Sequence, residues 1–203
     1  MSLAQWFRFH ADDVDIAEAG EVDLLFVGDS ITHGWDGQPL WQEAFGRWRP
    51  ANFGIGGDTT SNVLWRLRHG GIGNLAPKVV VLMIGTNNFW VNHNEPAEVA
   101  DGIAAVVHLL RASFPRARIL VLSIFPRDEF PDGENRLKVE AVNRLLPRLD
   151  DGEHVFVRDI GAVFLEPDGR LSKAVMPDFL HPSAEGYRRW AEAMLPIITP
   201  WLE

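Results

Sequence analysis

Four short polar blocks of this sequence contain the side chains that acyl transfer from an ester requires. "GDS" carries the hydroxyl of Ser30, and "PDFLHP" carries a carboxylate and an imidazole three residues apart, at Asp178 and His181. A serine hydroxyl becomes an effective nucleophile when a base removes its proton, and an imidazole oriented by a carboxylate is such a base. The developing oxyanion also needs N–H donors. The two blocks in between, around Gly57 and Asn87, contain candidates for that role.

Most of these residues also have a purely structural interpretation. Ser30 can cap the helix that follows it, and Asn87 can hold a turn with its side-chain amide. Asp29 lies beside the serine, but a cap or a strand-end hydrogen-bond acceptor is the role we expect for it. Asp178 fits the acid of a triad better, because an aspartate three positions before His181 can orient the imidazole and stabilise its protonated form.

The glycine-rich stretch "NFGIGGDTT" does not favour nucleotide binding. Its glycines at positions 54, 56 and 57 follow the second predicted strand, whereas a dinucleotide fingerprint follows the first. The third glycine of that fingerprint is missing, because Thr59 occupies its place. Glycines of this kind can serve a turn alone, or they can bring a backbone N–H close to an oxyanion.

The segments that must position these blocks alternate between strand-like and helix-like patterns. Apolar, β-branched runs predict five strands, over residues 23–27, 50–55, 78–84, 117–124 and 154–160. Helical spacing of apolar residues occupies four segments, over residues 61–69, 97–114, 135–149 and 184–198. We expect Pro147 and Pro196 to bend or end the helices that contain them. The alternation predicts an α/β fold, a three-layer α/β/α sandwich around a parallel sheet.

The polar blocks are expected to meet at one edge of that sheet. In a doubly wound sheet, ligands bind outside the carboxyl ends of the strands. The first three blocks each follow a predicted strand, and the last one precedes the final helix. The sequence therefore predicts that a hydroxyl, a base, a carboxylate and several amide donors converge there.

Composition narrows the classes of partner and compartment. The chain of 203 residues is 46% hydrophobic and 23% charged, which is typical of one globular domain, here residues 1–203. A net charge of -9 argues against a nucleic-acid partner. No apolar run approaches the roughly 20 residues of a membrane span, and the N-terminus lacks signal-peptide features. We therefore expect a cytoplasmic protein.

Metal and cysteine chemistry are not expected. The absence of cysteine excludes disulfides, thiolate metal ligands and a cysteine nucleophile. The six histidines other than His181 have no convincing metal-ligand spacing. The expected site therefore contains neither a metal nor an organic cofactor.

The blocks "FVGDS", "NFGIGGDTT", "VLMIGTNN" and "PDFLHPSAEGY" resemble, in order and spacing, those of the GDSL or SGNH hydrolases. The second block is similar to that of the catalytic subunits of platelet-activating-factor acetylhydrolase isoform Ib. The resemblance extends from the first predicted strand to the last helix. It implies a flavodoxin-like sheet of five parallel strands and a serine esterase that needs no cofactor.

The resemblance also implies individual roles. Ser30 is the implied nucleophile, and His181 and Asp178 are the implied base and acid of a Ser-His-Asp triad. Gly57, Asn87 and the backbone N–H of Ser30 are the implied oxyanion hole. The same resemblance implies a preference for acetyl esters and a homodimer.

Further residues are candidates for substrate contact. Ile31 follows the nucleophile and Leu180 precedes the base, so both are expected beside the acyl group, where large aliphatic side chains favour a short chain. Three aromatic residues are candidates for stacking on the alcohol portion, although loop packing is the alternative for at least one of them: Trp35, Phe89 and Trp90. Arg127 can bind an anionic substrate or pair with a neighbouring acidic residue.

The sequence leaves the substrate and part of the function open. Acetylated carbohydrates, phospholipid-like esters and other small-molecule esters all fit. An acyltransferase that uses the same acyl-enzyme with an alcohol acceptor is an alternative to the hydrolase. A non-catalytic binding module on this scaffold is disfavoured, because every expected catalytic position holds a competent residue.

Overall fold

Five parallel strands form the centre of the molecule in the computed structural model, which describes residues 1–203. The strands are β1 (Leu24–Gly28), β2 (Pro50–Gly54), β3 (Val79–Met83), β4 (Arg118–Leu122) and β5 (Val155–Arg158). They pair in the order β2-β1-β3-β4-β5, and every pairing is parallel. All residues of β1 and β3 are buried, as their unbroken hydrophobicity predicts. The five predicted strands and the α/β fold class are confirmed.

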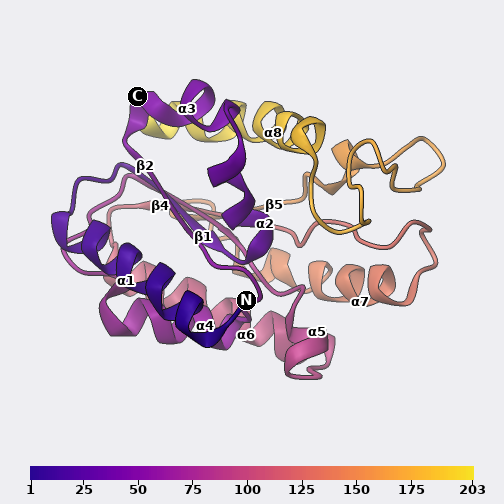
Figure 1. The fold of residues 1–203 in the computed structure, drawn as a ribbon, viewed down its shortest axis with the longest axis horizontal. Helices are drawn as coiled ribbons and strands as arrows, with labels where there is room; N and C mark the ends of the chain where they lie inside the picture. The colour runs from indigo at the N-terminus through magenta and orange to yellow at the C-terminus, as the bar shows by residue number, and fades with distance from the viewer.

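Helices cover both faces of the sheet (Figure 1). One face carries α1 (Leu3–Ala19), α4 (Thr60–Arg66), α6 (Pro96–Ser113) and α7 (Glu134–Asn143). The other carries α3 (Leu40–Phe45) and α8 (Ala184–Leu202). Two hydrophobic clusters of 28 and 24 buried residues fill the two interlayer spaces. The three-layer arrangement follows from this double coverage.

Shorter helical segments connect these elements. Two single-turn α-helices, α2 (Ser30–His33) and α5 (Asn88–Val91), follow β1 and β3 directly. The 3-10 segments are η1 (Gly34–Gly37), η2 (Gly46–Trp48), η4 (Leu146–Leu149) and η5 (Gly161–Phe164), and a π turn forms η3 (Leu67–Gly71). The two short helices occupy the carboxyl-terminal edge of the sheet, where the polar blocks were predicted to meet.

Local sequence explains most helix boundaries. Thr59 and Asn62 form a capping box at the start of α4, and Pro96 is the first residue of α6. Helix α7 ends before Pro147, as predicted. Helix α8, by contrast, continues through Pro196 to Leu202, so this proline does not end the helix. A continuous stripe of buried residues holds α8 against the sheet on both sides of the proline: Trp190, Met194, Ile198 and Leu202.

Helix α1 lies outside the predicted elements. Ser2 and Gln5 cap it through reciprocal hydrogen bonds. Its buried residues include the polar side chains of His10 and Asp13. A hydrophobicity pattern cannot identify such a face, because two of its three buried positions are polar.

Two aromatic residues expected near the substrate are instead part of the core. Trp35 is fully buried, with its ring against five others: Phe26, Trp41, Phe45, Tyr187 and Trp190. Phe89 is 7% exposed and belongs to the cluster on the opposite face of the sheet. The short turn after α2 directs Trp35 inward, so it contacts no ligand in this conformation. Loop packing was the correct interpretation for both.

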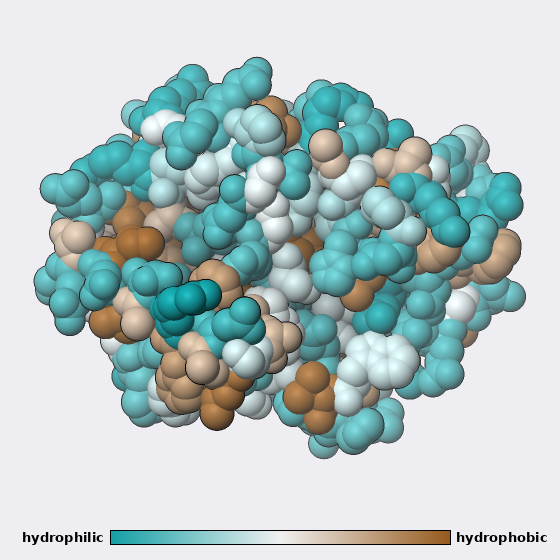
Figure 2. Space-filling view, in the orientation of Figure 1, coloured by the Kyte–Doolittle hydropathy of each residue, from teal (hydrophilic) through white to brown (hydrophobic).

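The exterior contrasts with this apolar interior. Figure 2 shows a mainly polar surface on the viewed face, with apolar side chains in small separate groups. None of the helices combines the length and the apolar character that crossing a bilayer requires.

Replacing Trp35 by alanine should lower the free energy of unfolding by about 3–5 kcal/mol, because a fully buried indole leaves a large cavity. Trp90, which is 57% exposed, is the matched control, and its alanine variant should change that free energy by less than about 1 kcal/mol. Urea unfolding followed by circular dichroism measures both. Equal, small losses would contradict a core role for Trp35.

Candidate active site

The candidate nucleophile lies at the first turn after β1. Asp29 is the N-cap of α2, and its Oδ1 accepts a hydrogen bond of 3.0 Å from the backbone N–H of Ile31. Ser30 is therefore the first helical residue and not the cap, and the expected structural role of Asp29 is confirmed. Gly28 permits the turn, since a Cβ there would lie 2.1 Å from Thr32 Oγ1. Burial raises the pKa of the Asp29 carboxyl to about 7.

A hydrogen-bonded chain joins the first polar block to the last. Ser30 Oγ lies 2.8 Å from His181 Nε2, although the two residues are 151 positions apart. His181 Nδ1 lies 2.7 Å from Asp178 Oδ2. The order of contacts is therefore hydroxyl, imidazole, carboxylate. This is the geometry in which a carboxylate orients an imidazole for proton transfer from a serine.

The loop that carries the imidazole is held by its own aspartate. Asp178 Oδ1 accepts the backbone N–H groups of Leu180, at 3.1 Å, and His181, at 2.7 Å. Burial acts to raise the pKa of Asp178, but the His181 ring and these two N–H groups hold that pKa below its usual range. Asp178 therefore stays ionised beside the imidazole at neutral pH.

Gly57 and Asn87 provide N–H groups near the serine. Gly57 has a φ of +86°, its backbone N–H makes no hydrogen bond within the protein, and the space where a Cβ would stand is open. Asn87 Nδ2 donates a hydrogen bond of 2.9 Å to the carbonyl of Asp58, which leaves its second N–H uncommitted. A Cβ on Gly56, the preceding residue, would lie 3.8 Å from Ser30 Cβ. The three blocks are thus adjacent.

A buried charge cluster, formed by Arg66, Asp13, Asp58 and Trp6, supports this arrangement. The Arg66 side chain is 1% exposed and donates to Asp58 Oδ2 at 2.7 Å and to Asp13 Oδ2 at 2.9 Å. Trp6 Nε1 donates to the other oxygen of Asp58 at 2.6 Å. Burial raises the pKa of both carboxyls, and the guanidinium opposes that shift. The cluster fixes the turn that presents Gly57.

Sequence reasoning did not identify this cluster. The sequence suggests Asp58 only as one of two possible caps of the helix predicted over residues 61–69, with Thr59 as the other, and it suggests no role for Trp6, Asp13 or Arg66. One signal was present: Arg66 lies within the apolar spacing of α4, next to Leu67, where a solvated arginine is not expected. The partners of that arginine come from 8 and 53 positions away, so the sequence pattern could not identify them.

The other candidate contacts divide into exposed and buried residues. Ile31 is 1% exposed, which contradicts a direct contact with the acyl group in this conformation. Its side chain belongs to the 24-residue cluster, and the Tyr187 hydroxyl of that cluster donates a hydrogen bond of 2.7 Å to the Ile31 carbonyl. Leu180 is partly buried at the edge of that cluster. Trp90 and Arg127 lie at the same edge of the sheet as the serine, with Arg127 Cζ 5.5 Å from the Trp90 ring.

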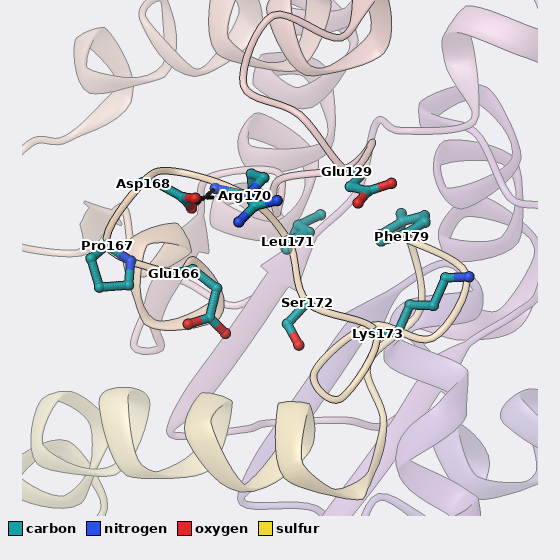
Figure 3. A pocket seen from close by; sticks show the side chains of 9 residues that line it. All are labelled: Glu129, Glu166, Pro167, Asp168, Arg170, Leu171, Ser172, Lys173 and Phe179. Atoms are coloured by element: carbon teal, nitrogen blue, oxygen red, sulfur yellow. Dashed lines mark hydrogen bonds and ion pairs between the residues drawn. The ribbon is translucent and has the colours of Figure 1, made fainter.

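A cavity of about 530 Å³ flanks the loop that carries His181. Figure 3 shows the side chains around it, with Phe179 and Lys173 on one side and Arg170 paired with Asp168 on the other. Phe179 stands between the two triad candidates in the sequence, and its side chain lines this cavity. Most of the residues that line the cavity are polar or charged, and Ser30 is not among them. No group of three or more histidine, aspartate or glutamate side chains is placed to hold a metal.

Comparison with known proteins identifies the family. Residues 26–189 match the GDSL-like lipase/acylhydrolase family, and this segment contains all four polar blocks. The chain belongs to that family. The α2 subunit of platelet-activating factor acetylhydrolase IB from Rattus norvegicus is 40% identical over 203 residues, which cover 98% of this chain and 86% of the rat protein. The chain is accordingly a carboxylic ester hydrolase, and the resemblance seen in the sequence is confirmed.

Solved structures of a lipase and of an esterase have the same fold. A GDSL-like lipase from Bacteroides thetaiotaomicron superposes with a TM-score of 0.78 at 22% identity, over 98% of this chain and 99% of that one. A variant of an acetyl-xylooligosaccharide esterase from Geobacillus superposes with a TM-score of 0.68 at 20% identity, over 87% and 94% of the two chains.

Replacing Arg66 by methionine should lower the free energy of unfolding by about 3–5 kcal/mol, because it leaves two buried carboxylates without their cation. Turnover per folded molecule should also fall, since the turn that presents Gly57 is no longer held. Arg68, an exposed neighbour on the same segment, is the matched control and should behave as wild type. Urea unfolding and esterase assays at one pH measure both effects. Wild-type stability of the Arg66→Met protein would contradict the role of the cluster.

Proposed function

We propose that this GDSL hydrolase cleaves short-chain acyl esters, acetyl esters first, through a Ser30–His181–Asp178 triad and an acyl-enzyme intermediate. The observation that carries the proposal is the chain of two hydrogen bonds, 2.8 and 2.7 Å long, from the serine hydroxyl to the aspartate. The nucleophile and the base are both partly exposed, so an ester can reach them.

In the first half of the reaction, Ser30 Oγ attacks the ester carbonyl while His181 Nε2 takes its proton. Asp178 Oδ2 accepts a hydrogen bond from His181 Nδ1–H, stays ionised, and stabilises the imidazolium that forms. The backbone N–H of Gly57, the free N–H of Asn87 and the backbone N–H of Ser30 donate to the oxyanion. The tetrahedral intermediate then breaks its bond to the alcohol oxygen, which receives the proton from Nε2 and leaves.

The second half uses the same groups in reverse. Water gives a proton to His181 Nε2 as its oxygen attacks the acyl carbonyl of the modified Ser30. The collapse of the second tetrahedral intermediate releases the acid, and the proton returns to Ser30 Oγ. An alcohol in place of water would give acyl transfer, the alternative left open by the sequence.

The acetyl preference has separate support. The rat relative named above is described as an acetylhydrolase, and one of the structural neighbours as an acetyl-xylooligosaccharide esterase. Leu180 adjoins the base and lies partly buried against the core, so it can limit the length of the acyl group. The alcohol portion of the substrate is not defined by these features.

The test is hydrolysis of p-nitrophenyl acetate, butyrate, hexanoate and octanoate by wild type and Ser30→Ala. The alanine variant should lose turnover by about 10⁴-fold or more, because the nucleophile is absent. Ser113→Ala, at the end of α6, is the matched control and should retain full activity. Activity of the wild type should fall with acyl length.

Three outcomes would count against the proposal. Comparable rates for Ser30→Ala and wild type would contradict the proposed triad. Faster cleavage of the octanoate ester than of the acetate ester would contradict the proposed acetyl preference. Methyl acetate as the main product in the presence of methanol at low concentration would make the enzyme a transferase.

A further inference from the structure

Arg127 carries a guanidinium that the protein itself does not satisfy. The residue is 9% exposed, and its one hydrogen bond runs from Nη1 to Thr86 Oγ1 at 3.0 Å. Nε is buried without a partner, and Nη2 makes no hydrogen bond within the protein. The carboxylates of Asp128, Asp178 and Asp29 act on Arg127 only from a distance, and none forms an ion pair with it. Two donors on the same edge of the guanidinium are therefore free.

Two other buried arginines have structural roles, and in both of them every guanidinium nitrogen has a hydrogen-bond partner. Arg136 is 2% exposed, and its Nε, Nη1 and Nη2 each donate to a backbone carbonyl: those of Arg127, Gly169 and Asp128. Arg66 uses all three nitrogens in the same way, on carboxylates and carbonyls. A buried charged donor without a partner is costly, and native structures rarely leave one unpaired. Arg127 is the exception among the three.

The position of Arg127 is next to the reacting groups. Thr86, its hydrogen-bond partner, precedes the oxyanion candidate Asn87 in the chain. On the other side, the backbone N–H of Asp128 donates to the carbonyl of Phe179, in the loop that carries His181, at 3.0 Å. Arg127 thus lies between the loop that carries Asn87 and the loop that carries His181.

The exposed ring of Trp90 completes the surroundings. The ring lies 5.5 Å from Arg127 Cζ, and 57% of Trp90 is accessible to solvent. An aromatic ring beside a guanidinium fixes its plane and leaves the in-plane N–H groups available to a ligand. Nε is shielded from water, so Nη2 is the donor that an entering group meets first.

We propose that Arg127 binds an anionic group, a carboxylate or a phosphate, on the alcohol portion of the ester substrate. The inference rests on the proposed function, since it assumes that the ester is cleaved at Ser30. The planar edge of a guanidinium matches the paired oxygens of these two anions. The alcohol oxygen must receive its proton from His181 Nε2, so the alcohol portion extends along the loop that adjoins Arg127.

The test compares matched acetate esters that differ only in charge. One pair is 4-acetoxybenzoate and its methyl ester, and the other is 4-acetoxyphenyl phosphate and its dimethyl ester. Each kcat/KM is divided by the rate of alkaline hydrolysis of the same compound, which corrects for leaving-group ability. Wild type should favour the anionic member of at least one pair by about tenfold or more, mainly through KM, because a charge-assisted hydrogen bond is added. The preferred pair identifies the carboxylate or the phosphate.

Variants locate the effect. Arg127→Gln should bring the anionic-to-neutral ratio close to one, and Arg127→Lys should give an intermediate ratio, because it keeps the charge without the planar fork. Arg148, an exposed arginine that pairs with Asp101, is the matched control, and Arg148→Gln should keep the wild-type ratio. A ratio that survives in Arg127→Gln, or no preference in wild type for either pair, would overturn the proposal.

A measurement on wild type alone covers the case in which the variant does not fold. The products 4-hydroxybenzoate and 4-hydroxyphenyl phosphate, compared with their neutral methyl esters, are tested as competitive inhibitors of p-nitrophenyl acetate hydrolysis. Tighter inhibition by the anion supports the proposal, and equal inhibition contradicts it. Failure of the proposed function can be distinguished from failure of the Arg127 proposal. It would appear as unchanged turnover in Ser30→Ala, whatever the preference for anionic substrates.

Discussion

The buried guanidinium of Arg66 is the constraint on which the geometry of the site depends. It donates to the carbonyls of Phe53 and Gly28, near the ends of β2 and β1, and to the carboxylates of Asp58 and Asp13. One side chain therefore joins two strand ends, helix α1 and the turn after β2. The Asp58 carbonyl accepts a hydrogen bond from the side-chain amide of Asn87, which follows β3. The Arg66 guanidinium therefore also helps to fix the position of that amide. Breaking a buried ion pair leaves an uncompensated charge, so this arrangement has little freedom.

The remainder of the fold brings His181, the proposed general base, to that edge. Helix α8 packs on the sheet through the 24-residue cluster, and Ser183 caps its start two residues after His181. The Asp178 carboxylate uses one oxygen to hold its own loop and the other to meet the imidazole. Hydrophobic burial on two faces thus places a hydroxyl and an imidazole within 2.8 Å of each other. The apolar layers stabilise the fold, and the proposed reaction takes place at the polar edge.

The parts of this account that sequence could predict are those with local causes. Strands β1 and β3 are unbroken apolar runs, and α6 begins at Pro96 with a regular apolar stripe, so each is visible within a short window. Helix α1 and the burial of Trp35 and Ile31 depend on contacts between distant segments. The unpaired edge of Arg127 also depends on distant segments, because the sequence does not show which hydrogen-bond partners a side chain lacks in the folded protein.

Covalent labelling tests the central claim most directly. The enzyme is inactivated with diisopropyl fluorophosphate, which phosphorylates an activated serine, and the modified peptide is identified by mass spectrometry. The account predicts one phosphoryl group per chain on Ser30, formed in proportion to the loss of esterase activity, and no label in a His181→Ala variant. Complete inactivation with the label on another residue, or full labelling of Ser30 without loss of activity, would contradict it.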